Sequence, residues 1–437
     1  MSHLVHLTNA RLAQGDQLVS GDLWFDPKAG VFVPPPNPAP TSTVIDIQNR
    51  IVAPGFLDLQ INGAYGFDFS EDSANNHAGI SYTERYRDVR RKLIATGTTS
   101  LLPTMTSPSK SRDPFDGAES LGAHCEGPFF AHNRMGVHLP NAIHASGVTS
   151  EPERVLETYG ARNLINTDGL SNRASPRSIP SNVRMITMAP ERLGALDTIK
   201  QLSQAGIIMS IGHTAANYQQ SRAGIDAGAT MITHLYNQMN GHHHREPGPL
   251  GILGGAGDVN EENETRILKQ DQKGEDTNIN RPYFGIIADG NHVHPASIRL
   301  AQLMHPGGLV LVTDALLLLG GEDGTIDWLT RRLTKKGVSV TLEGTDIIAG
   351  SCVTLLQCLN NFRRWTGVSI PIALQAVTSR PAAVLGLSHL KGTLRVGADA
   401  DFVVLKEEAV QGQCTSDLVV DQVWKFGVKV YDQATHE

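Results

Sequence analysis

Eight short apolar runs are spaced along the middle of this chain, and the segments between them are long enough to form helices. Most of the runs read as strands buried on both faces of a parallel sheet. Several intervening segments have helical spacing, for example 197–205 and 221–227. The runs lie at 56–61, 99–105, 123–129, 185–189, 207–211, 230–235, 284–288 and 309–313. Eight such alternations predict an α/β fold, a (β/α)₈ barrel of the TIM type.

Polar side chains occur within or just after the carboxyl-terminal halves of these runs. In a barrel of this kind the carboxyl ends of all strands meet at one face, which carries the active site. A doubly wound open sheet fits the same spacing, but ligands distributed over so many strands favour the barrel. The residues are Asp58, Gln60, Asn62, Glu126, His213, His234, Asp289 and Asp314.

Three of these residues, Glu126, His213 and His234, carry side chains of the types that serve as ligands for transition-metal ions. One carboxylate and two imidazoles form a set that suits Zn²⁺ or Fe²⁺ and leaves a position open for water. Asp314 ends a further run, and a carboxylate beside that water is suited to act as its general base. Taken singly, each residue has a structural explanation: Glu126 could form a salt bridge with one histidine, the other histidine could cap a turn, and Asp314 could be a helix N-cap. Their joint arrangement predicts a metal-dependent hydrolase.

The two ends of the chain differ in pattern from the middle. Residues 1–53 and 388–437 contain short strand-like segments separated by Gly, Asp and Pro turns. We therefore predict a small β-sandwich domain built from both termini, with the catalytic barrel at 54–387 inserted between them. Two polar stretches, 163–182 and 255–281, are expected to be surface insertions without chemistry.

Composition limits the partners and the compartment. The net charge is −7 and no basic block is present, which argues against a nucleic-acid partner. No window approaches a membrane span, and the first residues lack the features of a secretory signal. The four cysteines show no CxxC pair or regular spacing, so we expect free thiols in a reducing compartment. A cytoplasmic protein with a small-molecule substrate is the expectation.

A series of short motifs follows the predicted strand ends in order. They are IVAPGFLD at 51–58, HCEGPF at 124–129, GHT at 212–214, THLYN at 233–237, REPG at 245–248, IADGNH at 287–292, VTDA at 312–315 and AGS at 349–351. Together with GADAD at 397–401, this series resembles the N-acetylglucosamine-6-phosphate deacetylase family of the amidohydrolase superfamily. The resemblance covers the chain from about residue 50 to about residue 405.

The resemblance implies removal of the acetyl group from N-acetylglucosamine 6-phosphate, giving glucosamine 6-phosphate and acetate in amino-sugar metabolism. It implies one divalent metal ion held by Glu126, His213 and His234, with Zn²⁺ as the first choice and Fe²⁺, Co²⁺ or Mn²⁺ as alternatives. The superfamily usually carries His-x-His on the first strand for a second metal. Here the two positions are Gln60 and Asn62. Neutral amides are poor ligands for such ions, so one tightly held ion is expected.

The resemblance also implies roles for other residues. Asp314 would pass a proton from water to the leaving nitrogen, and His138 would bind the sugar or polarise the carbonyl. The phosphate end is expected near a homodimer interface, where Arg245 reaches the neighbouring site. Gln238 stands where the family commonly has a small residue, so it either narrows the phosphate pocket or points away. The expected substrate-binding residues are Val137, His138, Asn237, Gln238, Arg245, His292, Ile348, Ala349 and Gly350.

Three alternatives remain open at this point. A cyclic amidase or dipeptidase would favour two metals and His-x-His on the first strand, which Gln60 and Asn62 argue against. A catalytically inactive scaffold would lack a metal ligand or Asp314, and none is missing. A sugar-phosphate sensor would bind its ligand without releasing acetate.

Overall fold

The computed structural model describes residues 3–37, 42–71, 79–104, 112–138, 151–164, 182–255, 281–412 and 415–435. The surface insertions expected at 163–182 and 255–281 lie almost wholly outside the described residues, as does Cys414. None of the helices in the described part of the chain combines the length and the apolar character that a bilayer crossing requires.

The eight apolar runs form parallel strands, each close to its predicted position. They lie in two sheets, with strand orders β10-β9-β6 and β11-β12-β13-β14-β15-β16. Isolated parallel bridges join the two sheets at both edges, between Ile61 and Ala315 and between Thr104 and His124. The eight strands at these runs are β6 (Phe56–Ile61), β9 (Thr98–Pro103), β11 (Ala123–Glu126), β12 (Val183–Met188), β13 (Ile208–Ile211), β14 (Met231–Ile232), β15 (Tyr283–Ile286) and β16 (Leu309–Leu311). A ninth, the short β10 (Glu119–Ser120), was not predicted.

Helices alternate with these strands, as the spacing predicts. Every residue of β6, β9 and β12 is buried, which is typical of parallel strands covered on both faces. Capping boxes begin α1 at Ser81, α5 at Asn217 and α8 at Thr354. The helices are α1 (Tyr82–Ile94), α2 (Glu151–Tyr159), α3 (Ala161–Leu164), α4 (Ala195–Gln204), α5 (Tyr218–Asp226), α7 (Pro295–Met304), α8 (Leu355–Thr366), α9 (Ile370–Gln375) and α10 (Ser379–Val384).

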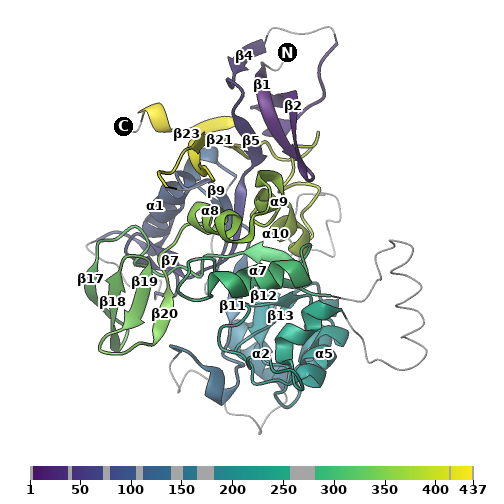
Figure 1. Ribbon diagram of the computed structural model, residues 1–437, viewed down its shortest axis with the longest axis vertical. Coiled ribbons are helices and arrows are strands. Elements are labelled where there is room, and N and C mark those ends of the chain that lie inside the picture. Colours follow the sequence, from purple (N-terminus) through teal and green to yellow (C-terminus); the bar gives the residue numbers. More distant parts are fainter. Residues whose placement is uncertain are drawn as a thin grey trace, which may run out of the picture.

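Strands from both ends of the chain form one mixed sheet of eight strands, toward the end of the molecule that carries both termini (top in Figure 1). Its order is β23-β22-β21-β5-β1-β2-β3, and β4 pairs with β1. The strands are β1 (Leu4–Gln14), β2 (Gln17–Asp26), β3 (Val31–Phe32), β4 (Ser42–Asp46), β5 (Ile51–Pro54), β21 (Phe402–Glu408), β22 (Asp417–Lys425) and β23 (Val428–Asp432). Both termini therefore contribute strands to this sheet, while the two-layer sandwich and the domain boundaries stay predictions.

A buried ion cluster joins this terminal sheet to the parallel strands. The Lys391 ammonium lies 2.6 Å from Asp401 and 3.0 Å from Asp399, and it also contacts Glu119 of β10. Lys425 of β22 lies 2.5 Å from Asp401. All five side chains are buried, so each charge depends on its partners for compensation. The three carboxylates are close enough to resemble a cation site, but the two ammonium groups already occupy them.

The sequence between β16 and α8 forms a four-stranded antiparallel sheet (left in Figure 1). This sheet was not predicted. Its strands are β17 (Gly324–Trp328), β18 (Arg331–Lys336), β19 (Ser339–Leu342) and β20 (Ile348–Ser351). The alternation of polar and apolar residues in Gly324–Trp328 and Ser339–Leu342 was the available signal. Two short strands, β7 (Gly63–Ala64) and β8 (Phe67–Asp68), follow β6 and contact this sheet, because Trp328 donates a hydrogen bond to Asp68.

Candidate active site

Three of the residues predicted to bind the metal or transfer the proton have an uncommon backbone conformation. His213, His234 and Asp314 follow β13, β14 and β16, and their φ angles are +47°, +28° and +48°. Residues with a Cβ rarely adopt this left-handed region, which costs about 1–3 kcal/mol per residue. The surrounding fold therefore holds these residues against their local preference. Such outliers concentrate at functional sites, and all three side chains line one cavity.

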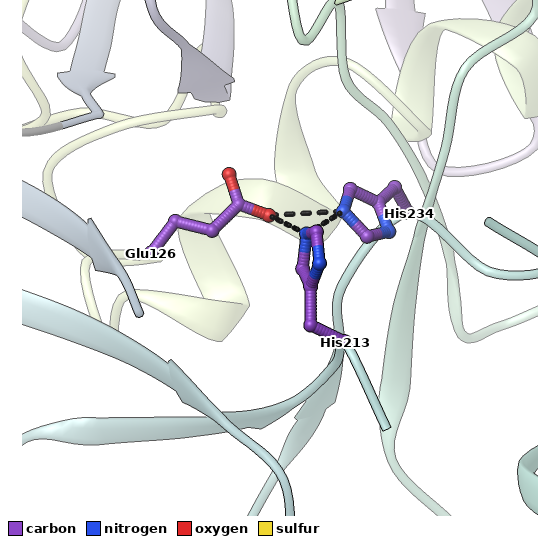
Figure 2. A group of neighbouring side chains, drawn as sticks. All are labelled: Glu126, His213 and His234. Atoms are coloured by element: carbon purple, nitrogen blue, oxygen red, sulfur yellow. Dashed lines mark hydrogen bonds and ion pairs between the residues drawn. The ribbon is translucent and has the colours of Figure 1, made fainter. Parts of the chain in front are cut away.

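The metal-ligand atoms predicted from the sequence converge on one point. Glu126 Oε1 lies 2.9 Å from His234 Nε2 and 3.3 Å from His213 Nε2, and the two nitrogen atoms are 3.1 Å apart (Figure 2). Ligands bound tetrahedrally at about 2.0–2.1 Å are separated by about 3.3 Å. The three side chains are buried, and Figure 2 shows them pointing at one another from separate elements. Their spacing and chemistry fit a single divalent ion.

Neighbouring groups orient these ligands. His213 Nδ1 donates to the Arg134 carbonyl over 2.7 Å, so Nε2 is left to present its lone pair to a metal. The Phe130 ring stacks on His213 with centroids 4.0 Å apart. Burial would raise the pKa of Glu126, but its contacts with His213 and His234 lower that pKa well below its usual value. The carboxylate therefore stays ionised, as a metal ligand must be.

Two side-chain amides, Gln60 in β6 and Asn62 just after it, face carboxylates. The Gln60 Nε2 atom donates to Glu126 Oε2 over 3.0 Å and to Asp314 Oδ1 over 3.2 Å. The Asn62 Nδ2 atom donates to Asp314 Oδ1 over 2.7 Å. The nitrogen atoms of these amides face the carboxylates, and an amide nitrogen is a donor only, with no lone pair available to a metal. The arrangement supports the interpretation of Gln60 and Asn62 as a pair of non-ligands.

Asp314 lies among the charged groups of this site with one carboxylate oxygen unbonded by the described residues. Burial, followed by the charge of Glu126, raises its pKa to about 6. Its Oδ1 atom accepts both amide hydrogen bonds, and no described residue forms a hydrogen bond with Oδ2. Oδ2 is therefore the atom available to take a proton. A carboxylate with a pKa near the working pH is well suited to act as both base and acid.

Two further histidines border the site. Burial, with the nearby His213, lowers the pKa of His138 to about 4, so this imidazole is neutral near pH 7. His292 lies with Nδ1 2.6 Å from Asp289 Oδ2. Burial would raise the pKa of Asp289, but His292 and two backbone N–H groups lower it. Asp289 thus fixes the ring orientation of His292 and leaves its Nε2 for a ligand.

A cavity of about 750 Å³ contains this centre and most of the predicted substrate residues. The Gln238 side chain packs beside Gly136, in the loop that carries His138. Gly350 lies behind the cavity wall, where a Cβ would come 2.7 Å from Leu316. Arg245 is exposed in a turn and does not line the cavity of its own chain. The predicted residues that line it are Val137, His138, Asn237, Gln238, His292, Ile348 and Ala349.

Several cavity residues were missed from the sequence. Trp328 lines the cavity, and its indole Nε1 donates to Asp68 Oδ2 over 2.8 Å. Arg331, at the other side of the β17–β18 turn, donates to the Val137 carbonyl over 3.1 Å. The residues on either side of the turn therefore connect β8 to the loop that carries His138. No local pattern marks these residues, because their contacts depend on how the antiparallel sheet folds over the cavity.

Comparisons with known proteins agree with this geometry. The amidohydrolase family matches residues 51–430. An N-acetylglucosamine-6-phosphate deacetylase from Danio rerio is 36% identical over 400 residues, covering 87% of this chain and 86% of that protein. The Homo sapiens enzyme of the same name is 34% identical over 430 residues, covering 93% of this chain and 92% of that protein.

A solved structure extends the likeness to the whole fold. It is a variant N-acetyl-D-glucosamine-6-phosphate deacetylase from Mycobacterium smegmatis, in complex with N-acetyl-D-glucosamine 6-phosphate. Its TM-score is 0.70 at 28% sequence identity, and the alignment covers 98% of this chain and 99% of that chain. The likeness therefore includes both the parallel strands and the sheet formed by the termini.

Proposed function

The chain belongs to the amidohydrolase family and, within it, to the N-acetylglucosamine-6-phosphate deacetylases, and we propose that it hydrolyses N-acetyl-D-glucosamine 6-phosphate to D-glucosamine 6-phosphate and acetate. One observation carries this proposal. The ligand atoms of Glu126, His213 and His234 converge beside Asp314 in a cavity wide enough for a sugar phosphate.

The ligand set supports one divalent cation per chain. A carboxylate oxygen and two imidazole nitrogens suit Zn²⁺ best, and Fe²⁺, Co²⁺ and Mn²⁺ also accept such donors. When bound, the ion supplies Lewis acidity, which brings the pKa of water toward neutrality. Gln60 and Asn62 direct N–H groups at the carboxylates, which favours one ion over two.

We assign the proton transfers to Asp314 Oδ2. It takes a proton from the attacking water, whose oxygen bonds to the acetyl carbon. As the C–N bond breaks, the same oxygen returns the proton to the sugar nitrogen, which leaves as a neutral amine. The neutral His138 lies beside His213, with ring centroids 5.1 Å apart, and would donate to the acetyl carbonyl oxygen as negative charge develops there.

The phosphate is assigned to the loop after β14. Asn237 and the backbone at Gln238 line the cavity and offer hydrogen-bond donors. Arg245 is held in an exposed turn by reciprocal hydrogen bonds between the backbones of His243 and Glu246. Its position outside its own cavity supports a homodimer in which the guanidinium reaches the partner's phosphate.

The architecture proposed with this function is a closed (β/α)₈ barrel at 54–387 with a small domain at 1–53 and 388–437. The bridges at both edges of the two parallel sheets support closure of the barrel. The pairing of β21 with β5 supports a domain shared by the termini. A cytoplasmic location is proposed from the free, buried thiols of Cys125, Cys352 and Cys358.

Product analysis tests the proposed reaction. The purified chain should convert N-acetylglucosamine 6-phosphate to equal amounts of acetate and free amine. The Asp314→Asn variant keeps the shape of the site but cannot take the proton, so its kcat should fall by roughly 10²–10⁴-fold. Near-normal turnover by this variant would remove Asp314 as the base. No product from the unmodified chain would reject the proposed substrate.

A further inference from the structure

The first parallel strand contains a bulge at the point where it enters the active site. β6 pairs Asp58 with Leu101 and Ile61 with Pro103, so it has one residue more than β9 between these pairs. The extra residue falls within Leu59–Gln60. Bulges beside active sites often redirect a side chain. Gln60 lies in this bulge, and its side-chain amide contacts both Glu126 and Asp314.

Hydrogen bonds fix both peptide groups of this bulge. The Gln60 N–H donates to Asp58 Oδ1 over 3.2 Å, and the Gln60 carbonyl accepts from the Asp314 N–H over 2.8 Å. The Leu59 carbonyl accepts from His124 Nδ1 over 3.0 Å. His124 belongs to β11, which is separated from β6 by β9, so this contact connects strands that are not adjacent.

His124 has a defined tautomer because the carbonyl of Leu59 can only accept. Its Nδ1 must carry the proton, and its Nε2 then accepts from the Thr187 hydroxyl over 2.8 Å. Thr187 in turn accepts from Thr233, and Thr233 from Ser210, each over 2.6 Å. All four side chains are buried. The result is a directed chain of hydrogen bonds beneath the metal ligands, ending at the bulge.

We infer that His124 is a positioning residue for the deacetylation proposed above. Its Nδ1–H holds the Leu59 carbonyl, and the bulge so fixed aims the Gln60 amide at Glu126 and Asp314. The catalytic part of this inference rests on the proposed function. The effect on metal binding does not, because Gln60 also donates to both oxygens of Glu126.

A matched pair of variants isolates the bond to Leu59. In His124→Asn the side-chain amide nitrogen stands close to the position of Nδ1, while in His124→Gln it stands close to the position of Nε2. The kcat of the Asn variant should stay within about threefold of that of the unmodified protein. The kcat of the Gln variant should fall roughly 10- to 100-fold, which is the usual effect of removing a group that orients a metal ligand. KM should stay nearly constant, because the phosphate contacts are remote from the bulge.

A double-mutant cycle tests whether His124 acts through Gln60. Gln60→Leu removes the amide donors, and adding His124→Gln to it should cost less than about twofold further. If the two substitutions acted independently, the fold decrease of kcat in the double variant would be the product of the decreases in the single variants. Ser203→Ala removes a hydroxyl that donates to the Lys200 carbonyl in α4, outside this chain of hydrogen bonds, so it serves as the control and should leave kcat and KM unchanged. Thermal unfolding of each variant reports whether the fold is retained.

Zinc affinity of the metal-free protein, measured by competition with a chromophoric chelator, supplies a readout without substrate. The dissociation constant should rise roughly tenfold in His124→Gln and change little in His124→Asn. The positioning role would be overturned if His124→Asn and His124→Gln had the same kcat and zinc affinity. It would also be overturned if the loss of kcat in the double variant equalled the product of the losses in the two single variants. If the unmodified chain releases no acetate, the proposed function fails, while the zinc comparison still decides the role of His124.

Discussion

Replacement of Asn62 by Leu should move the acid limb of the pH–rate profile to higher pH. In the proposed mechanism Asp314 must be deprotonated to accept a proton from water, so the rate should fall tenfold per pH unit below its pKa. Burial and the charge of Glu126 place that pKa at about 6. Asn62 opposes this rise by donating to Oδ1 over 2.7 Å. Leu has a similar volume and no donor, so the protonated form gains in relative stability.

The size of the shift follows from the hydrogen bond that is lost. A bond to a charged group contributes about 1.5–3 kcal/mol, and one pKa unit corresponds to about 1.4 kcal/mol. Gln60 still donates to the same oxygen over 3.2 Å and compensates in part. We therefore expect a shift of about one unit toward higher pH.

The assay is kcat/KM as a function of pH for both proteins under identical conditions. The phosphate of the substrate also titrates near pH 6, but it does so equally for both proteins, so the difference between the profiles reports the enzyme. Metal content is measured in each sample to exclude loss of the ion. An acid limb that stays in place, or moves to lower pH, would refute the assignment of this limb to Asp314.

Three further predictions concern other parts of the molecule. Arg245→Ala should raise KM for the phosphorylated sugar far more than for the unphosphorylated sugar, and an equal effect on both would contradict its role at the phosphate. Metal analysis should give about one ion per chain, whereas two tightly held ions would contradict the interpretation of Gln60 and Asn62. Lys391→Met should lower the free energy of unfolding, measured by urea denaturation, by about 3–5 kcal/mol. The reason is that Asp399 and Asp401 stay buried with less positive charge beside them. A decrease of less than about 1 kcal/mol would contradict this dependence of the carboxylates on Lys391.

The parallel strands were predictable because their apolar runs are bounded by turn residues. β6 begins and ends at the predicted residues, and the other strands differ by only a few positions. The convergence of Glu126, His213 and His234 was predictable for the same reason. Side chains that end parallel strands come together at one face, even though 87 residues separate the first ligand from the second.

Other features depend on contacts that no local pattern contains. The β17–β20 sheet has alternating residues, but its position over the cavity follows from hydrogen bonds such as that between Arg331 and Val137. The bulge in β6 is a property of register between two strands, and its effect on Gln60 requires His124 from a third strand. The left-handed backbone of His213, His234 and Asp314 is imposed by the fold on residues that do not favour it.

Acetate release, measured with N-acetylglucosamine 6-phosphate and with N-acetylglucosamine, each with and without a chelator, tests the central claim most directly. We predict turnover of the phosphate ester alone, abolished by the chelator and restored by a divalent metal. Such a result would establish the reaction, the requirement for metal and the recognition of phosphate together. Absence of turnover of either sugar by a protein that holds one metal ion would contradict the account and indicate a different amide substrate or a sensor.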